Sequence, residues 1–137
     1  MLLKPAKDSV DVLIFVRDIR KSLDFYHGLL GLEKTEEVQT PFGTVHRLRY
    51  GTSFVKLMDP KQVRPAGPIG LEKQLGIRYL SFVIRDLTTV CTALKERGVE
   101  FTMSETQVLP DTRIAMVKDP DGNIIEFNER AGASVGE

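Results

Sequence analysis

The same order of predicted elements occurs twice in this chain. The tetrapeptide VRDI at residues 16–19 is matched by IRDL at residues 84–87, so the two lie 68 residues apart. Each follows a run rich in β-branched residues, precedes a stretch with helical spacing, and is followed by three candidate strands. A module of roughly 60 residues would not bury much core alone. The pattern therefore predicts a tandem duplication of one βαβββ module whose two copies pack together.

In the first module, the run VDVLIFV at residues 10–16 predicts a strand. Asp18 is a natural N-cap for a helix starting at Ile19, and Gly31 is a natural stop for it. One face of this helix carries its apolar residues: Ile19, Leu23, Tyr26, Leu29 and Leu30. Turn sequences then separate three further strands, expected at residues 33–39, 45–50 and 54–58.

The second module repeats this order. RYLSFVI at residues 78–84 predicts a strand, Asp86 is expected to cap a helix over residues 87–97, and Gly98 is expected to end it. Further strands are expected at residues 99–104, 113–117 and 123–128. We therefore expect the first module at residues 9–59, a Pro- and Gly-rich connector at 60–76 that fits a mobile flap or a crossing, the second module at 77–129, and a flexible tail at 130–137.

Composition excludes several classes of function. The formal net charge is zero and the few aromatic residues are not interleaved with Lys and Arg, so we expect no nucleic-acid partner. No run of 18 apolar residues occurs, so we expect no membrane span. The single cysteine, Cys91, cannot form an internal disulfide and suits a reducing compartment. These features predict a cytoplasmic protein that binds neither nucleic acid nor membrane.

A carboxylate stands in an apolar strand near the C-terminus. Residues 119–123, DPDGN, predict a tight turn, because proline presets φ and glycine accepts a positive φ. In the strand that follows, period-two alternation puts Ile125 and Phe127 on one face and Ile124 and Glu126 on the other. We expect Glu126 either to meet water or to have partners in a cavity.

The segments FVRDIRKSLDFYHGLLGLE at residues 15–33 and DPDGNIIEF at residues 119–127 resemble the vicinal oxygen chelate superfamily, which includes glyoxalase I, extradiol dioxygenases and bleomycin resistance proteins. The resemblance spans about residues 9–129. It implies an α+β fold in which two tandem βαβββ modules form a cupped, partly open barrel. These motifs indicate the fold and do not indicate a reaction.

The resemblance also implies four positions at which metal-dependent members hold a divalent ion, mostly with His and Glu. In this chain they correspond to Asp11, Lys56, Tyr79 and Glu126. A lysine ammonium has no lone pair, and a neutral tyrosine is a poor ligand, so the donor set departs from the family pattern. We therefore expect no cofactor at this position. The alternative is a divalent metal bound unusually by Asp11, Glu126 and His46.

If these four residues lie together, they have either a catalytic or a structural role. In an enzyme, Lys56 would polarise a substrate carbonyl or pair with a carboxylate, Glu126 or Asp11 would act as the base, and Tyr79 as the acid. In the other interpretation the same groups form an internal salt bridge left where a metal used to be bound.

Strand alternation does not decide which face of residues 45–50 lines the cup. If Arg47 and Arg49 face the cup, they would bind an anionic ligand, and if His46 faces it, His46 joins the floor of the cup. Arg113 occupies the matching strand of the second module and has the same ambiguity.

Two functions are compatible with these features. The first is a protein that binds a small organic ligand in the cup without the usual divalent metal, like the resistance members of the superfamily. The alternative is an enzyme of the same superfamily, a lyase, isomerase or dioxygenase acting on a small oxygen-rich substrate through Glu126, with Lys56 or an atypical metal. By analogy with the superfamily we expect a homodimer.

Overall fold

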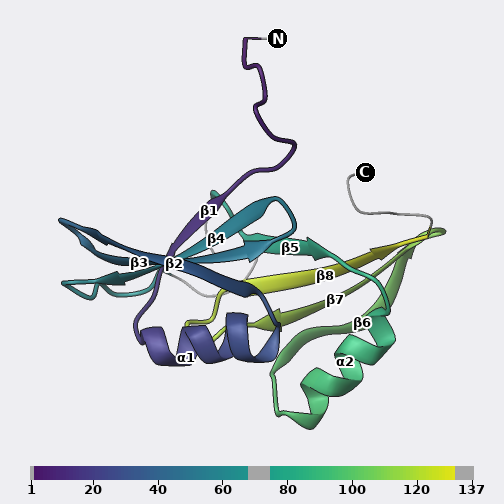
Figure 1. The fold of residues 1–137 in the computed structure, drawn as a ribbon. Helices are drawn as coiled ribbons and strands as arrows, with labels where there is room; N and C mark the ends of the chain where they lie inside the picture. Colours follow the sequence, from purple (N-terminus) through teal and green to yellow (C-terminus); the bar gives the residue numbers. More distant parts are fainter. Residues whose placement is uncertain (1, 68–74, 132–137) are drawn as a thin grey trace. The chain divides into compact units, whose positions relative to one another are not determined.

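The computed structural model describes residues 2–67 and 75–131. The chain divides into two compact units, with the boundary between Pro65 and Ala66. Each unit contains one four-stranded sheet. Figure 1 labels the strands of both sheets. The predicted α+β class and the two βαβββ modules are confirmed.

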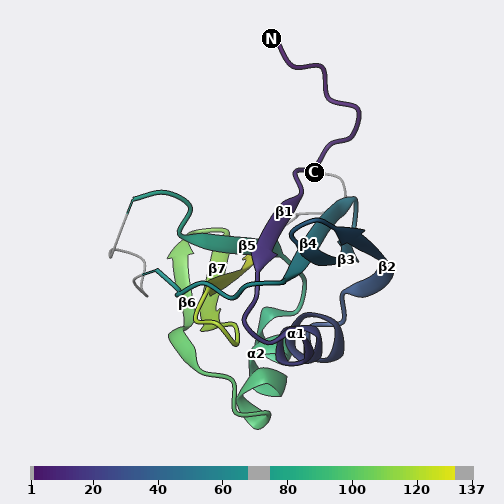
Figure 2. The ribbon, with the colours of Figure 1, turned by 90° about the vertical axis from the view of Figure 1, so that its left-hand side faces the viewer.

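In the first unit, β1 is followed by two helical segments and three strands. The bounds are β1 (Val12–Phe15), α1 (Ile19–Leu23), η1 (Asp24–Leu29), β2 (Glu33–Thr40), β3 (Gly43–Tyr50) and β4 (Ser53–Pro60). The strands lie in the order β1-β4-β3-β2, and only the β1–β4 pair is parallel. Figure 2 shows this sheet from a second side.

The first helical segment begins as the sequence predicts. The Asp18 carboxylate accepts hydrogen bonds from the backbone N–H groups of Arg20 and Lys21, at 3.1 and 3.2 Å, which satisfies donors that the first turn leaves free. The helix changes from α to π geometry at Asp24 and ends before Gly31, whose φ of 83° suits a residue without a Cβ. The stop at glycine was predicted, whereas the π segment was not.

One face of the first sheet is covered by this helix. α1 packs against β4, and the side chains of Leu48, Val55 and Leu57 on that face are fully buried together with Tyr26 of η1. Strand alternation places the neighbouring residues of β3 and β4 on the opposite face. Burial of the aliphatic side chains therefore fixes which residues point away from the helix.

The second unit has the same order of elements. The bounds are β5 (Tyr79–Val83), α2 (Leu87–Glu96), β6 (Phe101–Leu109), β7 (Thr112–Lys118) and β8 (Ile124–Arg130). The strand order is β5-β8-β7-β6, again with one parallel pair, β5 with β8. Helix α2 packs against β6, β7 and β8. In the core of this unit the rings of Phe82 and Phe127 are stacked, with their centroids 6.3 Å apart.

Asp86 is the N-cap residue of the second helix, as predicted, but its side chain does not form the capping hydrogen bond. Asp86 has a left-handed backbone (φ 57°, ψ 51°) and makes no capping hydrogen bond with its side chain. The N–H of Leu87 instead donates to the carboxylate of Glu129 on β8, at 2.7 Å. Glu129, which is distant in sequence, therefore accepts the hydrogen bond at the start of this helix that the nearby Asp18 accepts in the first unit.

Most predicted strands are present but differ at their ends. The first is shorter than expected, at Val12–Phe15, while β6 continues to Leu109. β4 extends to Pro60, into the expected connector. The central part of that connector, residues 68–74, and most of the expected tail, residues 132–137, lie outside the described residues, so the predictions of a flap and a flexible tail are not tested. Among the described residues, no helix is long and apolar enough to cross a membrane.

Candidate functional site

The face of the first sheet that points away from the helix carries Lys56. Lys56 is in register with Leu13 on β1 and with Arg47 on β3, so these three side chains form a row across the sheet. We call this surface the Lys56 face. Its residues are Leu13, Phe15, Glu33, Glu36, Val38, Val45, Arg47, Arg49, Phe54, Lys56 and Met58. The structure therefore places Arg47 and Arg49, and not His46, beside Lys56.

Asp11 lies directly before β1, at the border of the Lys56 face. Its Oδ1 atom accepts hydrogen bonds from the Lys7 ammonium at 2.6 Å and from the Phe54 amide at 2.8 Å. These two bonds, Lys7 first, hold the pKa of the Asp11 carboxyl below its usual value; partial burial opposes them, and the charges of Lys7 and Lys56 lower the pKa further. Asp11 is thus already engaged within its own unit.

The two arginines of the Lys56 face also have partners. Arg47 forms an ion pair with Glu36 on β2, and its guanidinium lies 4.1 Å from the centre of the Phe54 ring, a cation–π contact. Arg49 forms an ion pair with Glu33. Lys56 differs from both, because within the described residues its ammonium makes no hydrogen bond or ion pair.

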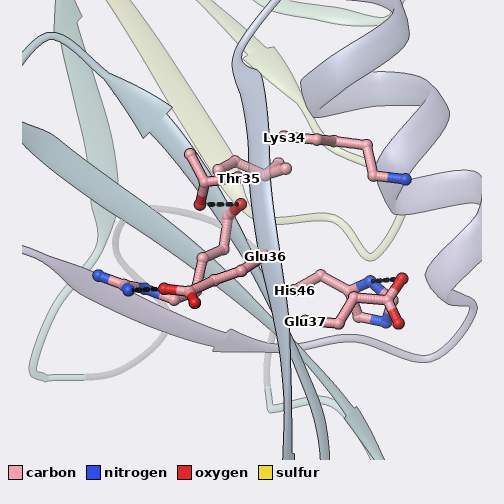
Figure 3. Close-up of a pocket in the computed structure, with 7 residues that line it drawn as sticks. Lys34, Thr35, Glu36, Glu37 and His46 are labelled. Atoms are coloured by element: carbon pink, nitrogen blue, oxygen red, sulfur yellow. Dashed lines mark hydrogen bonds and ion pairs between the residues drawn. The ribbon is translucent and has the colours of Figure 1, made fainter.

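His46 lies on the opposite side of the first sheet. Figure 3 shows Lys34, Glu37 and His46 on one side of β2, and Thr35 and Glu36 on the other. The Nδ1 atom of His46 lies 3.5 Å from a Glu37 carboxylate oxygen and makes no hydrogen bond within the described residues. Because Asp11 and Lys56 belong to the other face, His46 is not a member of their cluster.

A small cavity accompanies an irregularity of β2. The register shifts between Lys34 and Glu36, so Thr35 is an extra residue, and its hydroxyl donates to the Arg47 carbonyl at 3.0 Å. The cavity beside it measures about 180 Å³ and is lined by Lys34, Thr35, Glu36, Glu37, His46, Arg47 and Leu48 (Figure 3). It is smaller than the roughly 300 Å³ at which ligand pockets usually begin. A bulge in a charged edge strand prevents the strand from pairing with another chain, so we interpret this cavity as a by-product of the bulge and not as a ligand pocket.

In the second unit, Glu126 lies on the face of β8 that points away from α2. Arg113 and Glu129 point toward α2, since they bond Thr88 and the Leu87 amide, and Glu126 has the opposite parity to Glu129. Glu126 is only 6% exposed. Its apolar surroundings on this face are Ile114, Met116 and Ile124, with Met103 packed against them.

The buried Glu126 carboxylate has two polar partners in its own unit. The Ser81 hydroxyl donates a hydrogen bond at 2.7 Å, and the Asn128 amide donates a weaker one at 3.4 Å to the same oxygen. Both partners lie at positions that alternation and register place on this face, Ser81 directly opposite Glu126 on β5. A buried carboxylate with so few donors in apolar surroundings is suited to accept a proton or a hydrogen bond from a ligand.

The two remaining predicted residues of this unit have different positions. Tyr79 is half exposed and in register with Ile124, on the same face as Glu126. Arg113 is on the opposite face, where it pairs with Glu105 and donates to the Thr88 hydroxyl at 3.4 Å. Arg113 therefore joins β7 to β6 and α2, and the structure does not bring it to the Glu126 face.

The residues present do not fit the divalent ion that the resemblance implies. In the first unit, Asp11 is bonded to an ammonium group, and Lys56 offers no lone pair while charged. In the second unit, Tyr79 and Glu126 offer a phenol and one carboxylate. Within residues 2–67 and 75–131, no three side chains of His, Cys, Asp or Glu are grouped as metal ligands would be.

Sequence reasoning missed four residues of these clusters. Ser81 and Asn128 lie on the same face as Glu126, and the period-two rule applied to β5 and β8 would have found them. Phe54 could have been found in the same way from Lys56. Lys7 had no signal, because it precedes the first strand in a segment without periodicity.

Comparison with known proteins shows similarity over nearly the whole chain. A "Probable lactoylglutathione lyase" of Vibrio parahaemolyticus is 27% identical over 133 residues, covering 90% of this chain and 91% of that protein. A "Lactoylglutathione lyase" of Escherichia coli O157:H7 is 26% identical, covering 90% of this chain and 93% of its own length. The protein YurT of Bacillus subtilis, described as uncharacterized, is 30% identical over 85% of this chain and 94% of its own length.

Solved structures share the fold. TnmS3 of Streptomyces sp. CB03234, described as an antibiotic binding protein, superposes with a TM-score of 0.72 at 26% identity, over 93% of this chain and 99% of that one. SMU.1112c superposes with a TM-score of 0.77 at 24% identity, over 91% of this chain and all of that one. The family model described as Glyoxalase/Bleomycin resistance protein/Dioxygenase superfamily matches residues 9–127. The two βαβββ modules, the motifs at both ends of the match and these similarities together show that the chain belongs to the glyoxalase/bleomycin resistance protein/dioxygenase superfamily.

Proposed function

We propose that this chain is a binding protein that holds a small organic ligand on the Lys56 face without a divalent metal ion. The observation that carries the proposal is the Lys56 ammonium, which stands where metal-dependent relatives are expected to have a ligand and makes no hydrogen bond or ion pair among the described residues. A positive charge at this place repels a cation and attracts an anionic or carbonyl oxygen. The similarity to the antibiotic binding protein TnmS3 supports the same function.

The proposal is tested by metal analysis and ligand screening of the same preparation. Purified protein, dialysed without chelator, is analysed by mass spectrometry for Mn, Fe, Ni and Zn, and then screened against a panel of small organic compounds by thermal shift. We expect well below one metal ion per chain, and compounds that raise the melting temperature by binding the folded state. Lys56→Met is expected to weaken that stabilisation.

Lys34→Met is the matched control, because Lys34 is an exposed lysine on the other side of the same sheet. It is expected to leave the response to ligands unchanged. One tightly bound metal ion per chain that is lost in Glu126→Gln would overturn the proposal. Equal losses of ligand response in both lysine variants would also refute the assigned role of Lys56.

An enzyme of the same superfamily is the second candidate. It is favoured by Glu126, a buried carboxylate whose donors are Ser81 and Asn128, and by the relatives described as lactoylglutathione lyases. In such an enzyme, a lyase, isomerase or dioxygenase, Glu126 would act as the base and Tyr79 as the acid. Turnover of lactoylglutathione that is lost in Glu126→Gln but kept in the control Glu100→Gln would establish it.

We also propose that the protein is a cytoplasmic homodimer. The support is the exposed apolar surface on the edge strand of the second sheet, at Tyr79 and Val83 on β5. Light scattering coupled to size-exclusion chromatography tests this, with twice the chain mass of 15.4 kDa expected. A monomer at micromolar concentration would contradict it.

A further inference from the structure

The Lys56 face has an unbalanced charge at its centre. Lys56 and Arg47 lie directly opposite each other on β4 and β3, a like-charge pair that is unfavourable in a sheet. Arg47 is compensated by Glu36 and by the Phe54 ring, and Arg49 is compensated by Glu33. Lys56 is only partly exposed and makes no hydrogen bond or ion pair among the described residues; its charge lowers the pKa of Asp11, but that carboxylate is bonded to Lys7. A further negative charge that bonds directly to Lys56 would therefore be favourable at this place.

The surface next to Lys56 is apolar. Leu13, which is in register with Lys56, is 46% exposed, and Phe15, two residues further on the same face, is 56% exposed. Met58, in register with Phe15, is buried. Side chains of this size that remain half exposed on a sheet face offer a flat hydrophobic platform about two residues long.

Charge and shape together specify a class of ligand. We propose that the Lys56 face binds a carboxylate attached to a flat, apolar body, such as an aromatic acid: the carboxylate pairs with Lys56, and the body lies on Leu13 and Phe15. Arg47 adds positive potential but is held in place by Glu36 and Phe54, and Arg49 is remote from the platform and already paired. This inference rests on the metal-free binding function proposed above.

The test compares an acid with its neutral amide. 2-Naphthoate and 2-naphthamide have nearly the same shape, and only the first carries a charge. Their dissociation constants are measured by calorimetry, and the binding region is mapped by amide chemical shifts. For the unmodified protein we expect the acid to bind about tenfold or more tightly than the amide, which is the usual contribution of a charge-assisted hydrogen bond. The shifts are expected on β1 and β4.

Two substitutions distinguish the contribution of Lys56 to ligand preference from that of another positive charge on the same face. Lys56→Met is expected to bind the acid and the amide equally, whereas Arg49→Met, which removes an arginine from the same face, is expected to keep the preference within about threefold because Arg49 is exposed and paired. Lys56→Gln repeats the test if the methionine variant melts at a lower temperature than the unmodified protein. Preference for the acid that survives in both Lys56 variants would overturn the inference.

The outcomes also distinguish the inference from the proposed function. Metal-free protein that binds the amide as tightly as the acid, or that binds neither naphthalene compound but responds to other members of the panel, overturns the ligand class alone. Protein that carries one metal ion per chain, lost in Glu126→Gln, overturns the proposed function itself. Acid preference with shifts confined to the second unit would refute the assignment to Leu13 and Phe15.

Discussion

Removal of the Ser81 hydroxyl tests the candidate site most directly. Ser81→Ala leaves the Glu126 carboxylate, which is only 6% exposed, with the weak 3.4 Å contact from Asn128. A hydrogen bond to a charged group contributes about 1.5–3 kcal/mol, and a buried acceptor that loses its donor costs a similar amount. We therefore expect the free energy of unfolding to fall by about 2 kcal/mol. For a chain of this size that corresponds to roughly 8 °C in melting temperature.

The second variant of this experiment is Glu126→Leu. It removes the buried charge and fits beside Ile124 and Met116, while the Ser81 hydroxyl, on an exposed residue, is left to water. We expect this change to be nearly neutral, because the removed desolvation cost of the carboxylate offsets the loss of the weak 3.4 Å acceptor of the buried Asn128 amide. In the Glu126→Leu background, Ser81→Ala should then cost little.

Urea unfolding followed by circular dichroism measures all four members of this double-mutant cycle. The expected coupling energy between Ser81 and Glu126 is about 1–2 kcal/mol. Ser104→Ala on β6 is the matched control, since it makes the same substitution at an exposed strand position, and it should change stability by less than about 0.5 kcal/mol. The reasoning is refuted if Ser81→Ala costs no more than Ser104→Ala, or costs the same with and without Glu126.

Further predictions concern the two helix starts, the N-terminal segment and the core. Asp18→Ala should cost about 1 kcal/mol by urea unfolding because it removes a side-chain cap, whereas Asp86→Gly should be neutral or stabilising because it relieves a positive φ and removes no cap; equal costs would contradict this. Lys7→Met should raise the pKa of Asp11 toward its ordinary value of 3.8, as measured by carbon NMR. Because that pKa is lowered, Asp11 stabilises the fold above pH 3.8 and the contribution is lost as the pH falls through the lowered pKa, so the variant should lose less stability on acidification. An unchanged titration of Asp11 would show that Lys7 is not its partner. Leu57→Ala should cost about 2–5 kcal/mol because the side chain is fully buried, and a loss below 1 kcal/mol in the same urea assay would be inconsistent with the core described.

The candidate site was predictable where period-two alternation decides it. The sequence placed Glu126 on the face opposite Ile125 and Phe127, and Glu126 is buried there beside Ile124. The choice between His46 and Arg47 was not predictable, because alternation gives two faces and only the pairing of β3 with β4 shows which one contains Lys56. The ammonium partner of Asp11 was also not predictable, because Lys7 lies in a segment without periodicity.

The sequence by itself determined the local features: the repeated βαβββ order, the cap at Asp18 and the stop at Gly31, each of which depends on residues within one turn of the chain. The tertiary structure alone decided that the side chain of the equivalent Asp86 makes no capping hydrogen bond, because the Leu87 amide donates instead to the carboxylate of Glu129 on β8. It also decided which polar groups share a sheet face, because strand register joins residues that are far apart in sequence. A hydrogen bond or an ion pair needs its two atoms within a few ångströms, and that proximity is a property of the packed sheets and not of the order of residues.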